Sequence, residues 1–239
     1  MNTVKVCGLC YAPLSPVLAA AVAKDKMNEG GFFAVFTPGA TIHAHALGRE
    51  EKMELLLSAD LLLPDGQGVV LASRFARSPL PHRCAGIAFA ETLLSVAEAG
   101  TRFFFYGGRE GVAEEAARRM KEKHPHLSFA HASGYGDDPI EAIRVFSPHA
   151  LFVCLGYPRQ EQYIISHKER LPCLCVGLGG SFDVWSGRAA RAPVWVQKCG
   201  LEWAYRTLKE PHRIPRLFPL PAYFLHALRE GLKKERKQP

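Results

Sequence analysis

Several features that define common protein classes are missing from this 239-residue sequence. No stretch reaches the 18 or more consecutive apolar residues of a membrane-spanning helix, so we expect no such span. The amino terminus, MNTVKVCGLC, lacks the charged and long apolar segments of a secretory signal, which favours a cytoplasmic location. With 48% hydrophobic and 22% charged residues, the composition excludes a disordered chain and indicates a soluble globular fold.

The common nucleotide-binding motifs are also absent. Neither the dinucleotide fingerprint G-x-G-x-x-G nor the Walker motif occurs, which argues against an NAD-dependent dehydrogenase. No Asp-x-Asp pair is present to hold a divalent cation against a nucleotide diphosphate. We therefore predict a site without a metal ion or cofactor, in which arginines neutralise any diphosphate.

Positive charge is concentrated at the carboxyl end. The net charge is +7, yet residues 1–197 hold 20 Lys and Arg against 19 Asp and Glu, whereas residues 198–239 hold 10 against 4. This division argues against a uniformly basic nucleic-acid binder and indicates an anionic partner for the tail, such as membrane phospholipid, a phosphorylated substrate or RNA. Leucine and phenylalanine recur at helical spacing in the tail with basic residues between them, which is typical of a basic amphipathic helix.

Apolar runs of strand length alternate with segments of helical periodicity. Such alternation predicts an α/β fold, a Rossmann-like and mostly parallel sheet with flanking helices. We assign this domain to residues 1–195 and a basic helical C-terminal appendage to residues 196–239. The predicted strands are 31–37, 60–65, 102–108, 150–156 and 174–180, and the predicted helical segments begin near residues 41, 89, 111 and 159.

Glycines and polar residues follow each predicted strand, and the carboxyl ends of parallel strands meet at one edge of the sheet. Gly107, Gly108 and Gly111 stand before a helix, where backbone N–H groups and the helix N-terminus can receive a phosphate. A tight turn with close helix packing is the alternative.

Asp65 directly follows a strand, where partial burial raises a carboxyl pKa toward the range of a general base; a helix N-cap is the alternative role. Asp183 has the same two interpretations, and we favour a structural role there.

Cysteine and histidine carry less information. The seven cysteines lie mostly in apolar runs and fit buried structural thiols, with a redox or zinc half-site at Cys7 and Cys10 as the alternative. His43 and His45 are two residues apart and face different sides of a helix, so we assign the histidines no catalytic role.

Ten strings in register resemble the WecG/TagA/CpsF glycosyltransferases of bacterial cell-surface polysaccharide synthesis. They run from about residue 35 to 216 and are FTPGATI, ADLLLPDGQGVV, RCAG, FFFYGGREGVAEEAA, GYG, LGYPRQEQYI, VGLGGSFDVWSG, RAPVW, GLEWAYR and EPHRIPR.

The resemblance implies a metal-independent, inverting transfer of an N-acetylmannosamine-type sugar from a UDP-sugar to a polyprenyl-diphosphate-linked sugar. Asp65 matches the family's base, and Thr37 and Arg83 match residues of the acceptor and diphosphate pocket. The resemblance also places the tail over the active site and at the membrane, with Arg206, Arg213 and Arg216 available to the diphosphate or the lipid surface. The residues we assign to substrate binding are Gly39, Gly107, Gly108, Gly111, Val112, Gly134, Tyr135, Gly156, Arg159, Gln160, Glu161, Gly179 and Gly180.

Two positions depart from the family pattern. Gly39 stands where members carry asparagine, and Ala88 stands where they commonly carry an acid. The alternative function is therefore a catalytically altered UDP-sugar-binding protein. We expect an enzyme on the inner face of the cytoplasmic membrane, a possible homo-oligomer, with no nucleic-acid partner.

Overall fold

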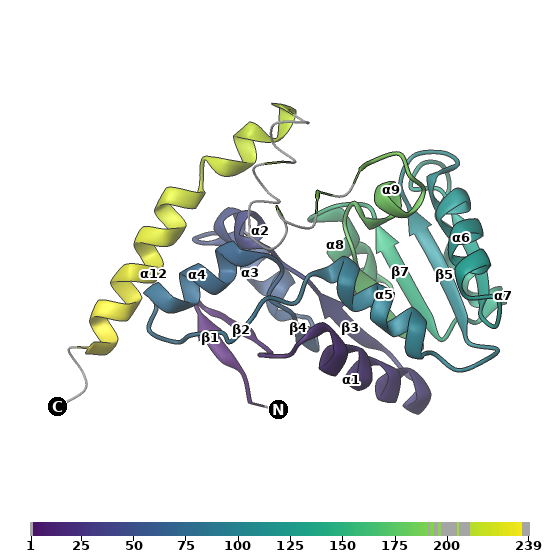
Figure 1. Ribbon diagram of the computed structural model, residues 1–239, viewed down its shortest axis with the longest axis horizontal. Coiled ribbons are helices and arrows are strands. Elements are labelled where there is room, and N and C mark those ends of the chain that lie inside the picture. Colours follow the sequence, from purple (N-terminus) through teal and green to yellow (C-terminus); the bar gives the residue numbers. More distant parts are fainter. Residues whose placement is uncertain (1, 191, 194–195, 197–204, 206–210, 236–239) are drawn as a thin grey trace.

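A computed structural model describes residues 2–190, 192–193, 196, 205 and 211–235, and it shows a parallel sheet with helices on both faces (Figure 1). The strands are β1 (Val4–Val6), β2 (Leu9–Tyr11), β3 (Phe33–Phe36), β4 (Leu61–Leu62), β5 (Arg102–Gly107), β6 (Ser128–Ala132), β7 (Ala150–Cys154) and β8 (Leu174–Gly177). The helices are α1 (Pro16–Glu29), α2 (Ala40–Ala46), α3 (Glu50–Leu57), α4 (Gln67–Phe75), α5 (Gly86–Val96), α6 (Val112–Lys123), α7 (Ile140–Phe146), α8 (Arg159–Ser166), α9 (Ser181–Trp185) and α12 (Leu220–Glu235), with short 3₁₀ helices η1 (Lys168–Arg170) and η2 (Pro211–Leu217).

The main sheet has six strands in the order β4-β3-β8-β7-β5-β6, and every neighbouring pair is parallel. The α/β fold predicted from the alternating pattern is confirmed, and all five predicted strands belong to this sheet. All five residues of β7 are buried, as expected for a strand covered on both faces.

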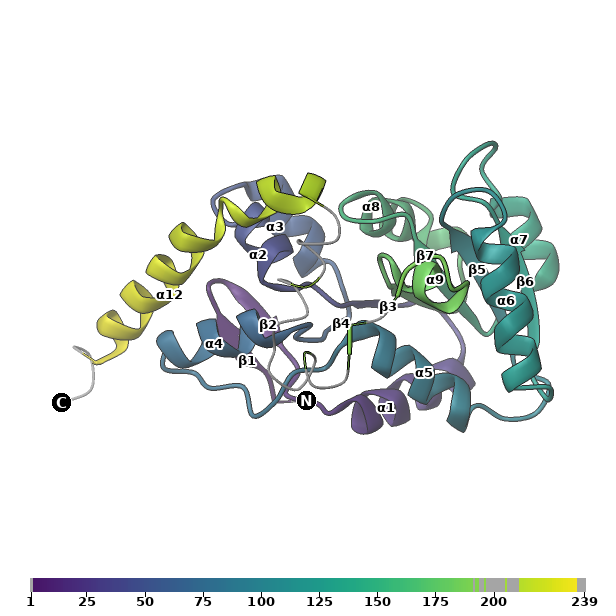
Figure 2. The same ribbon diagram turned by 45° about the horizontal axis from the view of Figure 1, so that its top comes forward.

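Alternate strand residues enter two separate cores, because successive side chains point to opposite faces. Phe103 and Phe105 pack with α1, α5, α6 and α9, whereas Phe104 and Tyr106 lie in the core formed with α2, α4, α7, α8 and α12. Figure 2 shows α1, α5 and α6 on one side of the sheet and α2, α3 and α8 on the other.

Several local features differ from the sequence prediction, which also named no helical segment for α1, α4 or α7. The helical segment that begins near residue 41 is divided into α2 and α3, because Gly48 adopts a φ of +75° between them. The edge strand β6 and the antiparallel hairpin β1-β2 were not predicted. Both lack an apolar run of strand length: β6 has the sequence SFAHA, and β1 and β2 have three residues each.

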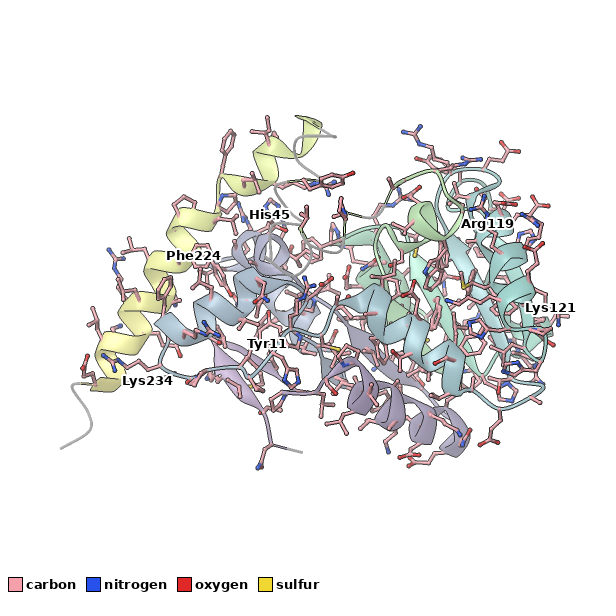
Figure 3. The ribbon with its side chains drawn as sticks, in the orientation of Figure 1. Tyr11, His45, Arg119, Lys121, Phe224 and Lys234 are labelled. Atoms are coloured by element: carbon pink, nitrogen blue, oxygen red, sulfur yellow. The ribbon has the colours of Figure 1, made fainter. Side chains whose placement is uncertain are left out.

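The described part of the tail is joined to the body. Tyr223 and Ala227 of α12 have no exposed surface and share the core of α2 and α4. Phe224 packs edge-on against Phe75, and the Lys234 ammonium donates to the carbonyl of Ala76 at 2.9 Å (Figure 3). The expected boundary at residues 195 and 196 is not tested by these contacts and stays a prediction. No helix within the described ranges is long and apolar enough to cross a bilayer.

A buried histidine connects α12 to the amino-terminal hairpin. The hydroxyls of Tyr11 and Tyr223 lie 3.0 and 3.1 Å from His43 Nδ1, and His43 Nε2 lies 3.2 Å from the carbonyl oxygen of Cys7. With the proton on Nε2, the ring donates to Cys7, and the lone pair of Nδ1 is the acceptor that the two tyrosine hydroxyls share. Burial lowers the pKa of His43 to about 4, so the ring is neutral at physiological pH. His45 is exposed, which agrees with the expectation that the two histidines face different sides.

We predict that Tyr223→Ala lowers the free energy of unfolding by about 3 kcal/mol or more, because it leaves a cavity and removes one partner of His43. Leu225→Ala on the same helix is the matched control, since Leu225 is 47% exposed, and it should cost less than about 0.5 kcal/mol. Urea unfolding of the full chain measures both values. Equal, small losses would show that α12 does not share the body's core.

Candidate active site

The carboxyl ends of β3 and β4 bring three predicted residues together. Gly39 and Asp65 form an isolated parallel bridge just beyond these strands. Thr37 lies at the end of β3 and its hydroxyl donates to the carbonyl of Gly177, at the end of β8, over 3.1 Å. A Cβ on Gly86 would lie 2.7 Å from the Thr37 hydroxyl, so the start of α5 packs directly on this side chain.

Asp65 is half-buried at the entrance to α4, and its alternative role as a helix cap is not observed. Gly66 holds the N-cap position and no side chain caps the helix. The segment with Arg83 lies alongside, because the Cys84 N–H donates to the carbonyl of Pro64 at 2.8 Å. Burial first, and then the charge of Asp65, raises the pKa of Cys84 to about 12. The aspartate and the Arg83–Cys84 segment therefore meet at one point of the sheet edge formed by the carboxyl ends of the strands. We call this edge the rim.

In the middle of the rim, Gln160 joins α8 to the loop after β8. Its side-chain oxygen accepts from the Gly179 N–H at 2.9 Å, and its amide donates to the Glu161 carboxylate at 2.9 Å. Gln160 and Glu161 are 3% and 2% exposed, so this pair is inside the protein. Gly180 follows as the N-cap of α9, and Asp183 lies in the first turn of that short helix.

Glu161 is the most perturbed acid of this region. Burial raises its pKa to about 7, against the opposing effect of the Gln160 hydrogen bond. Its Oε2 atom has no hydrogen-bond partner among the described residues, and neither has the buried hydroxyl of Tyr157. Tyr157 lies one turn away. Burial first, and then the charge of Glu161, raises the pKa of Tyr157, so the two groups are neighbours. The sequence analysis did not select Tyr157, although it stands inside the string LGYPRQE.

The ends of β5 and β7 form the other half of the rim. The chain leaves β5 toward β6 and leaves β7 toward β8, in opposite directions, which is the position where open α/β sheets bind ligands. Gly107 has a φ of +130°, and a Cβ there would lie 2.5 Å from the backbone of Cys154. Gly108 donates to the Cys154 carbonyl and accepts from the Gly134 N–H, both at 3.0 Å. A side chain at Gly107 or Gly134 would prevent the end of β5, the end of β7 and the loop after β6 from approaching this closely.

Helix α6 begins at this position without a side-chain cap. Gly111 is its N-cap in the left-handed region, with φ at +74°, and Val112 is buried. A Cβ on Gly111 would lie 3.3 Å from a guanidinium nitrogen of Arg188. The sequence analysis missed Arg188, which lies in the loop after α9; its only signal was its place directly after the string VGLGGSFDVWSG. The N-terminus of α6, with the Arg188 guanidinium beside it, therefore favours binding of an anion.

The remaining predicted residues are Gly156, Arg159, Tyr135 and the tail arginines. Gly156 precedes α8 with a φ of +76°, while Arg159 and Tyr135 are exposed. Arg216 is exposed on η2, which packs against α2. Arg206 and the side chain of Arg213 lie outside the described part.

From β4 to β5 the rim crosses four strand intervals of about 4.8 Å, roughly 19 Å in all. Two cavities of about 290 Å³ lie elsewhere, at the amino ends of the strands beside Arg102 and His149.

The sequence profile described as the Glycosyl transferase WecG/TagA/CpsF family matches residues 4–237. The chain belongs to this family. It is therefore a glycosyltransferase, which confirms the assignment made from the ten strings.

Curated members of the WecG/TagA/CpsF family resemble the chain over most of their length. A protein of Bacillus subtilis (strain 168) is 36% identical over 196 residues, covering 80% of this chain and 77% of its own. A protein of Bacillus spizizenii is 38% identical over 208 residues, with 84% and 80% covered. A protein of Staphylococcus aureus (strain MW2) is 32% identical over 209 residues, with 85% and 82% covered. All three are named N-acetylglucosaminyldiphosphoundecaprenol N-acetyl-beta-D-mannosaminyltransferase.

In this family member, Glu161→Gln should change the pH dependence of stability. The raised pKa means that the folded protein binds more protons than the unfolded chain between about pH 4.5 and 7. Stability contributed by the protonated carboxyl is present below pH 4.5 and is lost as the pH rises, by about 3 kcal/mol at most. Glutamine cannot ionise, so the variant does not lose this stability. Its unfolding free energy minus that of the wild type should therefore increase as the pH rises over this interval.

Urea unfolding at several pH values measures this difference. Glu54→Gln, at an exposed position, is the matched control and should follow the wild type at every pH. A Glu161→Gln curve parallel to the wild-type curve would show that Glu161 is solvated.

Proposed function

We propose that the chain transfers an N-acetylmannosamine-type sugar from a UDP-sugar to a polyprenyl-diphosphate-linked N-acetylglucosamine, with inversion and without a metal ion. The names of the relatives support the sugar and the acceptor. The observation that carries the proposal is the position of Asp65, an acid at the carboxyl end of the sheet, bridged to Gly39 and close to Thr37 and Arg83. This product belongs to the synthesis of teichoic-acid-type cell-surface polysaccharides.

In the proposed reaction, the Asp65 carboxylate takes the proton of the acceptor hydroxyl. The hydroxyl oxygen attacks the anomeric carbon, the bond from that carbon to the β-phosphate oxygen breaks, and UDP leaves with the electron pair. A single displacement needs one base opposite a stabilised leaving group, which one carboxylate with several cations can supply. Asp183 lies in the first turn of α9, and the proposed reaction leaves it a structural role, because no second carboxylate is needed.

The UDP part of the donor belongs at the β5 and β7 ends of the rim, with its β-phosphate and sugar extending toward Asp65. Gly107 and Gly108 bring backbone close to this point, the N-terminus of α6 is directed there, and the Arg188 guanidinium lies over Gly111. These groups are fixed before substrate arrives, so they receive the charge of the nucleotide phosphates without reorganisation. The rim spans roughly 19 Å from the end of β5 to the end of β4, which lets the UDP-sugar lie along it with the anomeric carbon and the β-phosphate oxygen beside Asp65, as a single displacement requires.

Membrane attachment through α12 completes the proposal. Its body-facing side is used for packing, but Leu225, Leu228 and Leu232 are 44–48% exposed, and Arg229 and Lys233 are exposed near them. An apolar strip with basic neighbours suits an anionic leaflet, where each basic residue contributes about 1 kcal/mol. Helix α12 packs along α4, and α4 begins two residues after Asp65. Docking of α12 therefore brings the base to a lipid-linked acceptor.

We predict that Asp65→Asn lowers kcat by about 10²- to 10⁴-fold, because the amide cannot accept the proton. UDP release is measured with UDP-N-acetylmannosamine and a prenyl-diphosphate-linked N-acetylglucosamine analogue. Asp183→Asn is the matched comparison and should change kcat far less. Equal rates for Asp65→Asn and wild type would remove Asp65 from its role. Tight UDP-sugar binding without turnover by the wild type would favour the sugar-binding alternative, to which Gly39 and Ala88 point.

We also predict that replacing Leu225, Leu228 and Leu232 together by serine weakens binding to anionic vesicles at least tenfold, since it removes the exposed apolar strip. Co-sedimentation with phosphatidylglycerol vesicles measures this loss. Replacing Val17 and Leu18 of α1 by serine is the matched control, because they are 65% and 55% exposed on a different element, and should leave binding unchanged. Undiminished binding of the α12 variant would place the membrane contact elsewhere.

A further inference from the structure

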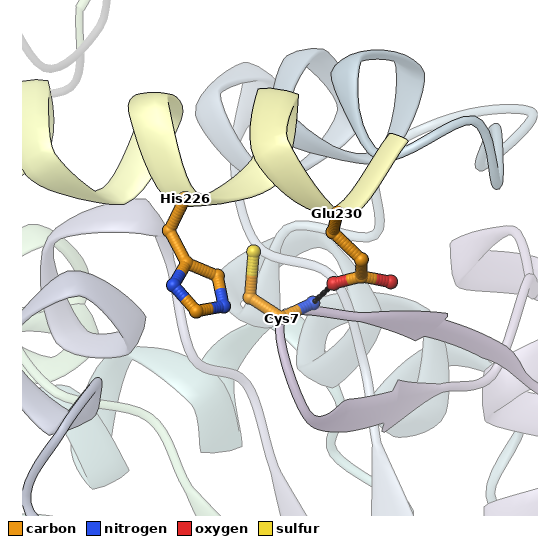
Figure 4. Close-up of side chains that lie close together, drawn as sticks. All are labelled: Cys7, His226 and Glu230. Carbon is orange, nitrogen blue, oxygen red and sulfur yellow. Dashed lines mark hydrogen bonds between the residues drawn. The ribbon is translucent and has the colours of Figure 1, made fainter. Parts of the chain in front are cut away.

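Three side chains with metal-binding atoms converge where α12 crosses the amino-terminal hairpin. They are Cys7, in the turn between β1 and β2, and His226 and Glu230 of α12. One ligand atom from each lies within 4.8 Å of the other two. Figure 4 shows His226 and Glu230 directed from α12 toward the hairpin turn, with the Cys7 thiol between them. None of the three belongs to the rim.

The donor set has the chemistry of a zinc site. A thiolate, an imidazole and a carboxylate are the ligands that Zn²⁺ accepts, and such a mixed soft and hard set does not suit Mg²⁺ or Ca²⁺. Tetrahedral bonds of about 2.0 to 2.3 Å place ligand atoms roughly 3.3 to 3.8 Å apart, so small side-chain rotations are enough to close the site. His226 and Glu230 are four residues apart on a helix, which puts both on one face. His226 is exposed and provides an entry path from solvent.

Neighbouring groups already hold the ligands in place. The Glu230 carboxylate accepts from the Cys7 N–H at 2.9 Å through one oxygen and pairs with Lys234 at 2.8 Å through the other. The carbonyl of Cys7 is held by His43. Metal sites commonly show such outer hydrogen bonds, which orient the ligands.

The backbone of the turn supports a role for the thiol itself. Cys7 and Gly8 have φ values of +45° and +91°, as a two-residue hairpin turn requires. Asparagine, aspartate and glycine are the residues usually found at the first of these positions, whereas cysteine rarely adopts a left-handed conformation. The chain therefore places a buried thiol at a strained position facing His226 and Glu230.

We propose that Cys7, His226 and Glu230 bind one Zn²⁺, with water as the fourth ligand, and that this zinc fastens α12 to the amino-terminal hairpin. On binding, the Cys7 thiol gives its proton to solvent, a bond from sulfur to zinc forms, and zinc releases water molecules. The site has a structural role and takes no part in sugar transfer, so it is compatible with a metal-independent reaction at Asp65.

The test adds Co²⁺, as a spectroscopic substitute for zinc, to the full-length chain purified with a chelator and freed of it. We expect saturation at one equivalent, a thiolate-to-cobalt charge-transfer band in the near ultraviolet, and displacement by Zn²⁺. Zinc should also raise the midpoint of thermal unfolding. Absence of a saturable thiolate band would overturn the proposal.

Variants assign the ligands. Cys7→Ser should abolish the thiolate band, and His226→Ala should weaken zinc binding at least tenfold. Cys10→Ser is the matched control in the same hairpin, because Cys10 is exposed and outside the cluster, and should keep full binding. Since His226 is exposed, its replacement leaves the fold intact even if Cys7→Ser does not. A band unchanged in either ligand variant would place the metal on other residues and overturn the assignment.

Discussion

The direction of the strands is the constraint on which the active site depends. Because all six strands of the main sheet are parallel, every carboxyl end lies at the same edge, and segments far apart in sequence become neighbours there. Thr37 reaches Gly177, Gln160 reaches Gly179, and Gly108 connects Cys154 to Gly134. An antiparallel strand among them would have carried its loop to the opposite edge and divided the site. The parallel topology therefore decides which residues meet at the rim, and the residue types then decide what chemistry they can perform.

Polar groups buried beneath this rim serve two different purposes. His43 has partners for both ring nitrogens, and burial keeps it neutral, so it can join α2, the hairpin and α12 without an unpaired charge. Glu161 has one oxygen without a partner among the described residues, and its pKa is raised to about 7. An unsatisfied buried carboxyl destabilises the protein, and such groups concentrate where a ligand completes them. The contrast separates a histidine whose polar atoms all have partners from a buried carboxyl with one oxygen that has none among the described residues.

The sequence predicts those parts of the structure that depend on neighbours in the chain. Strands such as β7 were predictable because burial on both faces requires a continuous apolar run, and the glycines after β5 were predictable because a strand-to-helix turn needs them. Strand β6 was not, since its sequence SFAHA contains no such run. The contact of Arg188 with Gly111 and the cluster of Cys7 with His226 and Glu230 were not predictable either. Cys7 and Glu230 are separated by 223 positions, and only the packing of α12 brings them together.

In the proposed function, that packing lets the C-terminal helix hold the body in one orientation at the membrane. Helix α12 lies along α4, and α4 starts immediately beyond the Asp65–Gly66 turn, so one rigid contact joins the exposed leucines that we propose as the membrane contact to Asp65, the proposed base. A flexible tether would bring the protein to a membrane but would leave the orientation of Asp65 free. In the proposed function, a helix fixed by Tyr223, Lys234 and the hairpin would set the angle between the leaflet and the rim. For an acceptor whose reactive sugar stays close to the membrane, orientation contributes to the rate as directly as affinity does, because reacting groups must meet in the correct geometry. If α12 binds the membrane as we propose, the burial of one of its faces and the exposure of the other are both needed for sugar transfer.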